Sequence, residues 1–266
     1  MRRSLVFTVL IGLLLGLGGT SPAQALAAPA SMASIGDSMT RAADVCCWYG
    51  DHPANSWSTG GASWDGITSH YERLRALNSN IAGHSYNDAK SGARMSDAPA
   101  QARLAVAQQA GYVTILMGAN DACTSSPASM TPVETYRSQF RQTLQILNSG
   151  RARIFVASVP DVYRLWQIYH TDVLATLVWQ IAGICQSLLA LNRTEADRQA
   201  VRNRVIAFNT VLQEECANVP KCRFDNDAVF NYPFARTDVS KLDYFHPSLT
   251  GQAALAQLTW PLSWWA

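Results

Sequence analysis

The chain has 266 residues, of which 48% are hydrophobic and 15% are charged, and its formal net charge is +2. Because soluble domains carry about 25% charged residues, its surface must rely on neutral polar groups. This composition excludes a disordered chain, a collagen-like repeat and a nucleic-acid binder held by a basic stripe, and the length is sufficient to bury a sizeable core.

Residues 1–25 have the pattern of a secretory signal peptide. Two arginines precede an apolar run over residues 5–17, and Ala-Gln-Ala at 23–25 is a small-x-small cleavage site. The apolar run is shorter than the ~20 residues that a membrane span needs. We therefore expect residues 26–266 to be secreted to the cell exterior as one domain with no integral membrane segment.

Removal of the signal peptide changes the charge of the protein. The two arginines lie in the removed segment, so the mature chain carries 19 basic and 19 acidic residues. No strong global field then steers the protein to nucleic acid or to anionic membranes. The sequence contains no signal for assembly, and we expect a monomer.

All six cysteines lie in the mature region, where an oxidising compartment favours disulfides. Six cysteines allow 15 pairings, of which two bonds stand out: Cys216–Cys222 across a short segment and Cys123–Cys185 across a long loop. The adjacent Cys46 and Cys47 remain open, because they could form a strained vicinal bond or one of them could take a distant partner.

Nothing in the sequence indicates a metal or a cofactor. There is no C-x-x-C motif, and zinc ligation by the cysteines is not expected. Four of the five histidines are scattered without ligand spacing, and we expect them to be surface or structural residues: His52, His70, His84 and His170.

The mature chain alternates short β-rich runs with amphipathic segments. In chain order the pattern predicts a strand at 31–35, a helix at 63–77, a weak strand at 81–86, a helix capped by Asp97, a strand at 113–117, a helix at 133–147, a strand at 153–159, a helix at 200–212, a short strand at 222–224 and a helix at 252–258. This alternation predicts an α/β fold in which both faces of a mostly parallel sheet are covered.

Two apolar features have alternative interpretations. Residues 173–184 are nearly all apolar but too short to span a bilayer. A buried helix is the expected structure, and an apolar wall or lid beside a substrate chain is the alternative. Four aromatic residues that follow the first strand could either line a pocket entrance or pack in the core: Trp48, Tyr49, Trp57 and Trp64.

Three polar loops follow predicted strands or precede the last helix. They are Gly-Asp-Ser at 36–38, Gly-Ala-Asn-Asp at 118–121 and Asp-Tyr-Phe-His at 243–246. In open parallel sheets, reactive groups gather at the carboxyl ends of the strands. We therefore expect these loops to lie close together.

Together the loops supply the parts of an acyl-transfer site. Ser38 is a nucleophile if a base removes its proton, and His246 suits that role because of its near-neutral pKa. Asp243, three residues earlier, could orient the imidazole through Nδ1. Donors for the oxyanion are the backbone N–H of Ser38 at a predicted helix start, the amide of Asn120 and the backbone N–H of Gly92.

Each piece alone has a common structural explanation. Ser38 could be a helix N-cap, Asn120 could belong to an ordinary turn, and His246 could be a surface loop residue. For Asp37 and Asp121, hydrogen bonding within their loops is the expected role. The combination of residue types in this order favours the catalytic interpretation.

With these motifs the sequence resembles the SGNH (GDSL) hydrolases, over roughly residues 33–260. Gly-Asp-Ser matches the first block with Ser38 as nucleophile, Gly92 and Asn120 match the glycine and asparagine of the second and third blocks, and Asp243-x-x-His246 matches the last block. Met39 departs from the usual leucine with a side chain of similar volume. Short stretches at 56–61, 97–102 and 245–246 resemble the phospholipase B-like branch.

The resemblance implies a three-layer α/β/α sandwich with a flavodoxin-like sheet and a cofactor-independent esterase that forms an acyl-serine. We expect an esterase or lipase acting on lipid carboxylic esters, with phospholipid acyl esters as candidates. The alternatives are a carbohydrate esterase that removes acetyl groups from polysaccharide, and a secreted binding protein on the same fold without catalysis.

Overall fold

The computed structural model describes residues 26–266, so the predicted signal peptide lies outside the described residues. One parallel sheet runs through the centre, with strand order β2-β1-β3-β4-β5. This is the order of flavodoxin-like folds, so the predicted α/β sandwich is confirmed. The strands are β1 (Met32–Gly36), β2 (Ser85–Asn87), β3 (Tyr112–Leu116), β4 (Arg153–Val156) and β5 (Cys222–Phe224).

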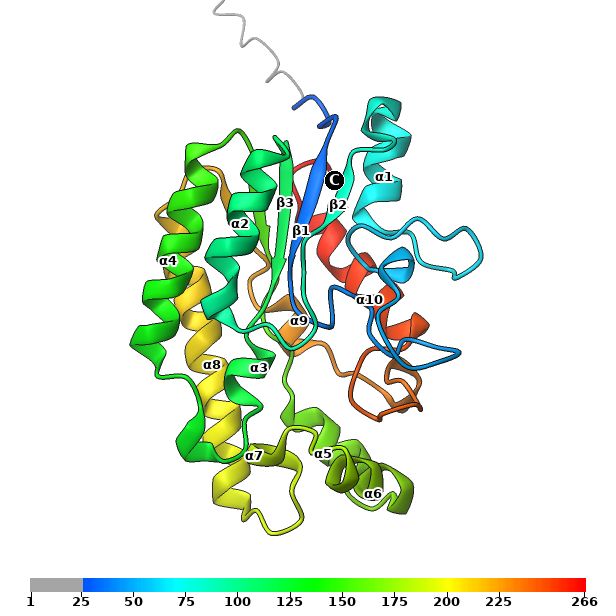
Figure 1. The fold of residues 1–266 in the computed structure, drawn as a ribbon, viewed down its shortest axis with the longest axis vertical. Coiled ribbons are helices and arrows are strands. Elements are labelled where there is room, and N and C mark those ends of the chain that lie inside the picture. Colours follow the sequence, from blue (N-terminus) through cyan, green and yellow to red (C-terminus); the bar gives the residue numbers. More distant parts are fainter. Residues whose placement is uncertain (1–25) are drawn as a thin grey trace, which may run out of the picture.

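Helices cover both faces of the sheet (Figure 1). On one side lie α2 (Ala98–Ala107), α4 (Val133–Ser149) and α8 (Glu195–Ala217), and on the other α1 (His70–Leu77) and α10 (Leu249–Thr259). The remaining α-helices are short: α3 (Ala119–Ala122), α5 (Tyr163–Tyr169), α6 (Val173–Ile181), α7 (Gln186–Leu189) and α9 (Ala228–Asn231).

Single 3₁₀ turns complete the connections between these elements. They are Pro53–Asn55, Ser79–Ile81, Met95–Asp97, Pro127–Ser129, Arg236–Asp238 and Trp260–Leu262. Helices α3, α5, α6 and α7 gather below the carboxyl ends of the central strands in Figure 1, at the edge where the polar loops also lie.

The hydrophobic core is centred on strands β1 and β3. Every residue of β1 and β3 is buried, and aromatic side chains such as Phe155 and Phe140 fill the space between sheet and helices. His70 is fully buried in this core, with Nδ1 2.9 Å from the Tyr112 hydroxyl and Nε2 2.8 Å from the Thr259 hydroxyl. Burial lowers the pKa of His70 to about 3, so this histidine is neutral and structural, as the sequence predicts.

Several predicted boundaries shift. Helix α1 begins at His70 rather than at residue 63, because Ser69 and Glu72 form a capping box that fixes the helix start. Strands β2 and β4 are shorter than predicted, and α8 extends further at both ends. Asp97 precedes α2, but its carboxylate accepts the Arg94 N–H of the preceding turn instead of capping the helix.

The prediction of a buried helix over residues 173–184 is wrong. Helix α6 forms there, and only Ala175 and Trp179 are buried. Four aliphatic side chains point outward, with exposed fractions of 51–78%: Val173, Leu174, Leu177 and Ile181. The helix is apolar on nearly all sides, so composition alone does not show which face meets the core. Among residues 26–266, no helix combines the length and hydropathy needed to cross a bilayer.

Candidate active site

The loop after β1 presents Ser38 as a series of hydrogen-bonded turns. The Arg41 N–H donates to the Asp37 carbonyl at 3.1 Å and the Ala43 N–H to the Ser38 carbonyl at 2.9 Å. No regular helix starts at Ser38, contrary to the prediction, because Ala42 and Asp44 both adopt a positive φ, which interrupts a right-handed helix. The Ser38 side chain nevertheless lies at the carboxyl edge of the sheet.

The structure brings Ser38, His246 and Asp243 into one hydrogen-bonded chain. The Ser38 Oγ lies 2.7 Å from the His246 Nε2, and the His246 Nδ1 bonds the Asp243 carboxylate on the other side of the ring. Asp243 is held by its own loop, since its second oxygen accepts the backbone N–H groups of Phe245 and His246 at 2.9 and 3.1 Å. A serine, a base and an orienting carboxylate in this order are the geometry of a serine hydrolase.

The charges around His246 favour the protonated ring. Burial lowers the pKa of His246, but the hydrogen bond and the negative charge of Asp243 outweigh it, and Asp44 and Asp37 add to the rise. Burial in turn raises the pKa of Asp243, but the combined effect of its bonds to His246 is larger and holds that pKa below its ordinary value. The ring can therefore accept a proton from Ser38 at Nε2, and the Asp243 carboxylate at Nδ1 stabilises the resulting positive charge.

Three N–H donors surround the space beside Ser38. Within residues 26–266 the backbone N–H groups of Ser38 and Gly92 have no hydrogen-bond acceptor. Asn120 donates one amide hydrogen to the Ala93 carbonyl at 3.0 Å, which fixes the side chain and leaves its second amide hydrogen available. Gly92 has a φ of +80°, a conformation that glycine adopts without strain.

These groups line one open cleft of about 400 Å³. Its walls include Ser38, Gly92, Asn120 and His246 on the polar side, and the loop at 183–185 between α6 and α7 on the other. A small apolar cavity of about 50 Å³ meets the cleft at Phe245, which lines both spaces. Four of the residues that the motifs single out therefore line one solvent-accessible cleft, and the buried Asp243 reaches it through His246.

Asp37 and Asp121 take part in the loops that shape the site. The Asp37 carboxylate accepts the Met39 N–H at 3.0 Å, and the Asp121 carboxylate accepts the Met95 N–H at 2.9 Å. Both side chains are buried, and burial raises the pKa of Asp37 to about 7 and also raises that of Asp121. Asp37 and Asp121 therefore make the hydrogen bonds within the loops that the sequence analysis expected.

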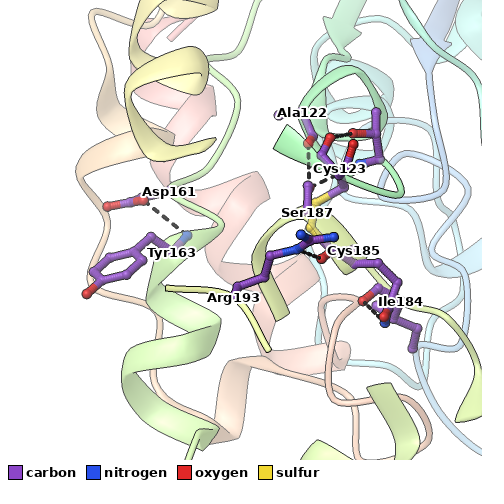
Figure 2. Close-up of a disulfide and its surroundings, with 11 residues drawn as sticks. Ala122, Cys123, Asp161, Tyr163, Ile184, Cys185, Ser187 and Arg193 are labelled. Carbon is purple, nitrogen blue, oxygen red and sulfur yellow. Dashed lines mark hydrogen bonds between the residues drawn. A yellow bond between two sulfur atoms is a disulfide. The ribbon is translucent and has the colours of Figure 1, made fainter. Parts of the chain in front are cut away.

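A disulfide ties two parts of the site together (Figure 2). Cys123, at the end of α3, bonds to Cys185 in the loop after α6, with an S–S length of 2.00 Å. Ser187 adds a hydrogen bond from its hydroxyl to the Ala122 carbonyl at 2.8 Å. The disulfide therefore links the segment that carries Asn120 to the opposite wall of the cleft.

The other cysteines lie outside this link. Cys216 and Cys222 form the second disulfide, with an S–S length of 2.02 Å, between the end of α8 and β5. Cys46 and Cys47 are not bonded, although their sulfur atoms are 2.6 Å apart. No distant partner is therefore assigned to either of them.

One residue beside the site was not among the predicted site residues. Asp44 places its carboxylate 3.8 Å from the Nδ1 of His246, which no sequence motif marks. Of the four aromatic residues left open, Trp57 is fully buried, whereas Trp48, Tyr49 and Trp64 are 64–69% exposed. None of the four is among the residues that line the cleft.

The solved structures to which this chain is similar have the same fold. An extracellular lipase from Streptomyces rimosus shares 17% identity at a TM-score of 0.50, covering 86% of this chain and 99% of the lipase. An acetyl xylan esterase named AlAXEase shares 12% identity at a TM-score of 0.54, covering 86% and 98%. An acetylxylan esterase from Geobacillus stearothermophilus shares 16% at 0.53, covering 88% and 95%.

The sequence comparisons resolve the family. No protein of curated function matches the chain. The family model described as GDSL-like lipase/acylhydrolase matches residues 32–259, a span that includes Ser38, Gly92, Asn120, Asp243 and His246. The chain belongs to this family, and it is a carboxylic ester hydrolase.

Proposed function

We propose that this protein is a secreted serine esterase that hydrolyses lipid carboxylic esters at the surface of a lipid aggregate. Ser38 attacks the ester carbonyl while His246 takes its proton, and the N–H groups of Ser38, Gly92 and Asn120 stabilise the oxyanion. An acyl-serine forms as the alcohol leaves with the proton from His246. Water then attacks the acyl-serine with the same base and releases the acid.

Exposed apolar side chains in two segments that adjoin the cleft support the lipid assignment. Helix α6 leads directly into residues 183–185, which line the cleft, and it contains no charged residue. On the other side, Trp48 and Tyr49 are 68% and 69% exposed in the loop between Asp44 and Gly50, both of which line the cleft. Apolar area of this kind beside a binding site is a feature of surfaces that meet a partner or a lipid.

A lipid surface satisfies this arrangement better than a polysaccharide does. Burying aliphatic side chains releases about 25 cal/mol for each Å² removed from water. A polysaccharide, whose surface is rich in hydroxyl groups, would leave the aliphatic side chains of α6 exposed to water. Both a lipase and acetyl xylan esterases occur among the similar structures, so the fold itself does not choose between them.

The test compares an aggregated with a dissolved substrate. Replacement of Leu174 and Leu177 by serine should lower the ratio of phosphatidylcholine-vesicle hydrolysis to p-nitrophenyl butyrate hydrolysis by tenfold or more. Leu104→Ser is the matched control, because Leu104 is 52% exposed on α2, away from the cleft. Its ratio should stay unchanged. Exclusive turnover of acetate esters, together with deacetylation of acetylated xylan, would instead establish the carbohydrate esterase.

The proposal of secretion has separate support. Residues 1–25 read as a signal peptide, and two disulfides suit an oxidising compartment. The similar lipase from Streptomyces rimosus is described as extracellular. N-terminal analysis of protein from the culture medium should give Leu26 as the first residue; an uncleaved chain retained in the cell would contradict secretion.

A further inference from the structure

A second carboxylate stands beside the imidazole of His246. The Asp44 Oδ2 lies 3.8 Å from the His246 Nδ1, the same ring nitrogen that bonds Asp243. The ligand-capable atoms of Asp44, Asp243 and His246 all lie within 4.8 Å of one another. The imidazole edge that faces away from Ser38 therefore meets two carboxyl groups from loops far apart in the sequence.

The loop holds Asp44 in place by contacts of its own. The Asp44 N–H donates to the Gly50 carbonyl at 2.8 Å, and the Gly50 N–H returns a bond to the Asp44 Oδ1 at 2.6 Å. Asp44 has a φ of 52°, a left-handed conformation that aspartate tolerates better than most residues. One oxygen is thereby fixed, and the other is directed at the ring of His246.

The same loop is attached to the loop that carries Asp243 and His246. The Ser240 hydroxyl donates to the Asp44 carbonyl, and the Tyr49 hydroxyl donates to the Leu242 carbonyl at 3.0 Å. The Ser240 N–H in turn donates to the His246 carbonyl at 2.8 Å. These contacts make the distance between Asp44 and the ring a property of two docked loops rather than of one exposed side chain.

Several charged groups lie near Asp44 and affect its pKa. Asp243 and His246 face it from the C-terminal loop, and the buried Asp37 acts on His246 from the nucleophile loop. The nearby Arg41 is paired with Asp51 at 2.9 Å. Burial and the charge of Asp243 raise the pKa of Asp44, while the Gly50 N–H lowers it.

We propose that Asp44 is a positioning residue that holds a second negative charge beside the His246 Nδ1 and takes over as acceptor of the Nδ1 proton when Asp243 is removed. This inference rests on the proposed function, because it assumes that His246 is the base for Ser38. A second negative group near Nδ1 stabilises the imidazolium that forms when Ser38 gives up its proton. The reaction therefore retains an orienting carboxylate even without Asp243.

The decisive experiment is a double-mutant cycle of Asp44→Asn and Asp243→Ala on a soluble p-nitrophenyl ester. The amide oxygen introduced by Asp44→Asn can still accept the Gly50 N–H, so the loop is kept while the charge is lost. The double variant should lose at least tenfold more kcat/KM than the product of the two single losses, because each carboxylate compensates for the other. Losses that simply add on a logarithmic scale would overturn the proposal.

A pH profile separates positioning from a merely structural role. Loss of the Asp44 charge should lower the pKa of His246, so the acidic limb of kcat/KM in Asp44→Asn should move to lower pH by about 0.5 unit or more. Glu134→Gln, which removes an exposed carboxylate on α4, is the charge control and should keep the parental limb. An acidic limb of kcat/KM that does not shift in Asp44→Asn would contradict the proposal. This measurement alone tests the role of Asp44 if Asp243→Ala fails to fold.

Failure of this inference is distinguishable from failure of the proposed function. If Ser38→Ala and His246→Ala are inactive, while the double-mutant cycle is additive and the acidic limb of kcat/KM does not shift, only the proposed role of Asp44 is wrong. If Ser38→Ala or His246→Ala keeps parental activity, the proposed function itself is wrong. Melting curves of every variant show whether the comparison concerns folded protein.

Discussion

The Ser38 Oγ and the His246 Nε2 lie 2.7 Å apart, although 208 positions separate them in the sequence. Parallel strands β1 and β3 bring their carboxyl ends to one edge, and the C-terminal loop returns to that edge before α10. The two side chains therefore meet because of sheet topology and not because of local sequence. The expected consequences of this arrangement can be measured one at a time.

Asn120→Ala should lower kcat by about 10²–10³-fold, because one oxyanion donor of this kind has that effect in other serine hydrolases. The amide also donates to the Ala93 carbonyl, so a small loss of stability accompanies the change. Steady-state kinetics with a soluble ester give the result. A rise of KM at constant kcat would show that Asn120 binds the ground state and not the oxyanion.

The activity should depend on pH through His246. Its folded pKa lies above the ordinary 6.5, since Asp243 outweighs the effect of burial, and only the neutral ring can accept the Ser38 proton. The value of kcat/KM should therefore be low in acid and rise with pH through a midpoint above 6.5. A midpoint below that ordinary value in the parent enzyme would contradict the assigned electrostatics.

Phe245 lines both the cleft and the small apolar cavity. Phe245→Ala should join the two spaces and raise the ratio of kcat/KM for octanoate to that for acetate by tenfold or more, because each newly buried CH₂ contributes about 0.8 kcal/mol. Phe230→Ala on α9 is the control for a lost phenyl ring outside the cleft. An unchanged ratio with intact folding would show that the cavity does not receive acyl chains.

The two disulfides should differ in their effect. The chain-entropy model gives about 4 kcal/mol for Cys123–Cys185, which are 62 positions apart, and about 2 kcal/mol for Cys216–Cys222, which are six apart. Denaturant unfolding of the two double-serine variants measures both. Loss of the first bond should also lower activity, since it links the Asn120 segment to the cleft wall; identical activity in both variants would contradict that link.

The motifs identified residues that the structure brings together, whereas the sequence pattern misplaced several boundaries of the helices and strands around them. Gly92, Asn120 and Asp243 could be chosen from the sequence because each belongs to a short pattern with a chemical reason. Asp44 could not, because its position beside His246 depends on two loops docking against each other through Ser240 and Tyr49. No local pattern records that contact.

Helix α6 shows a second limit of sequence analysis. Its residues are apolar on nearly every side, so periodicity indicates a helix but does not select the face that is buried. In the structure Leu174 and Leu177 are on the exposed side of the helix. The start of α1 is the opposite case, because the Ser69–Glu72 capping box is present in the sequence and was the signal to use.

Reaction of the secreted protein with a fluorophosphonate, followed by peptide mass spectrometry, tests the central claim most directly. One adduct should form on the peptide that contains Ser38, and it should be absent from a folded His246→Ala variant, because the hydroxyl is a poor nucleophile without its base. An adduct on another residue, or full esterase activity in Ser38→Ala, would contradict the account.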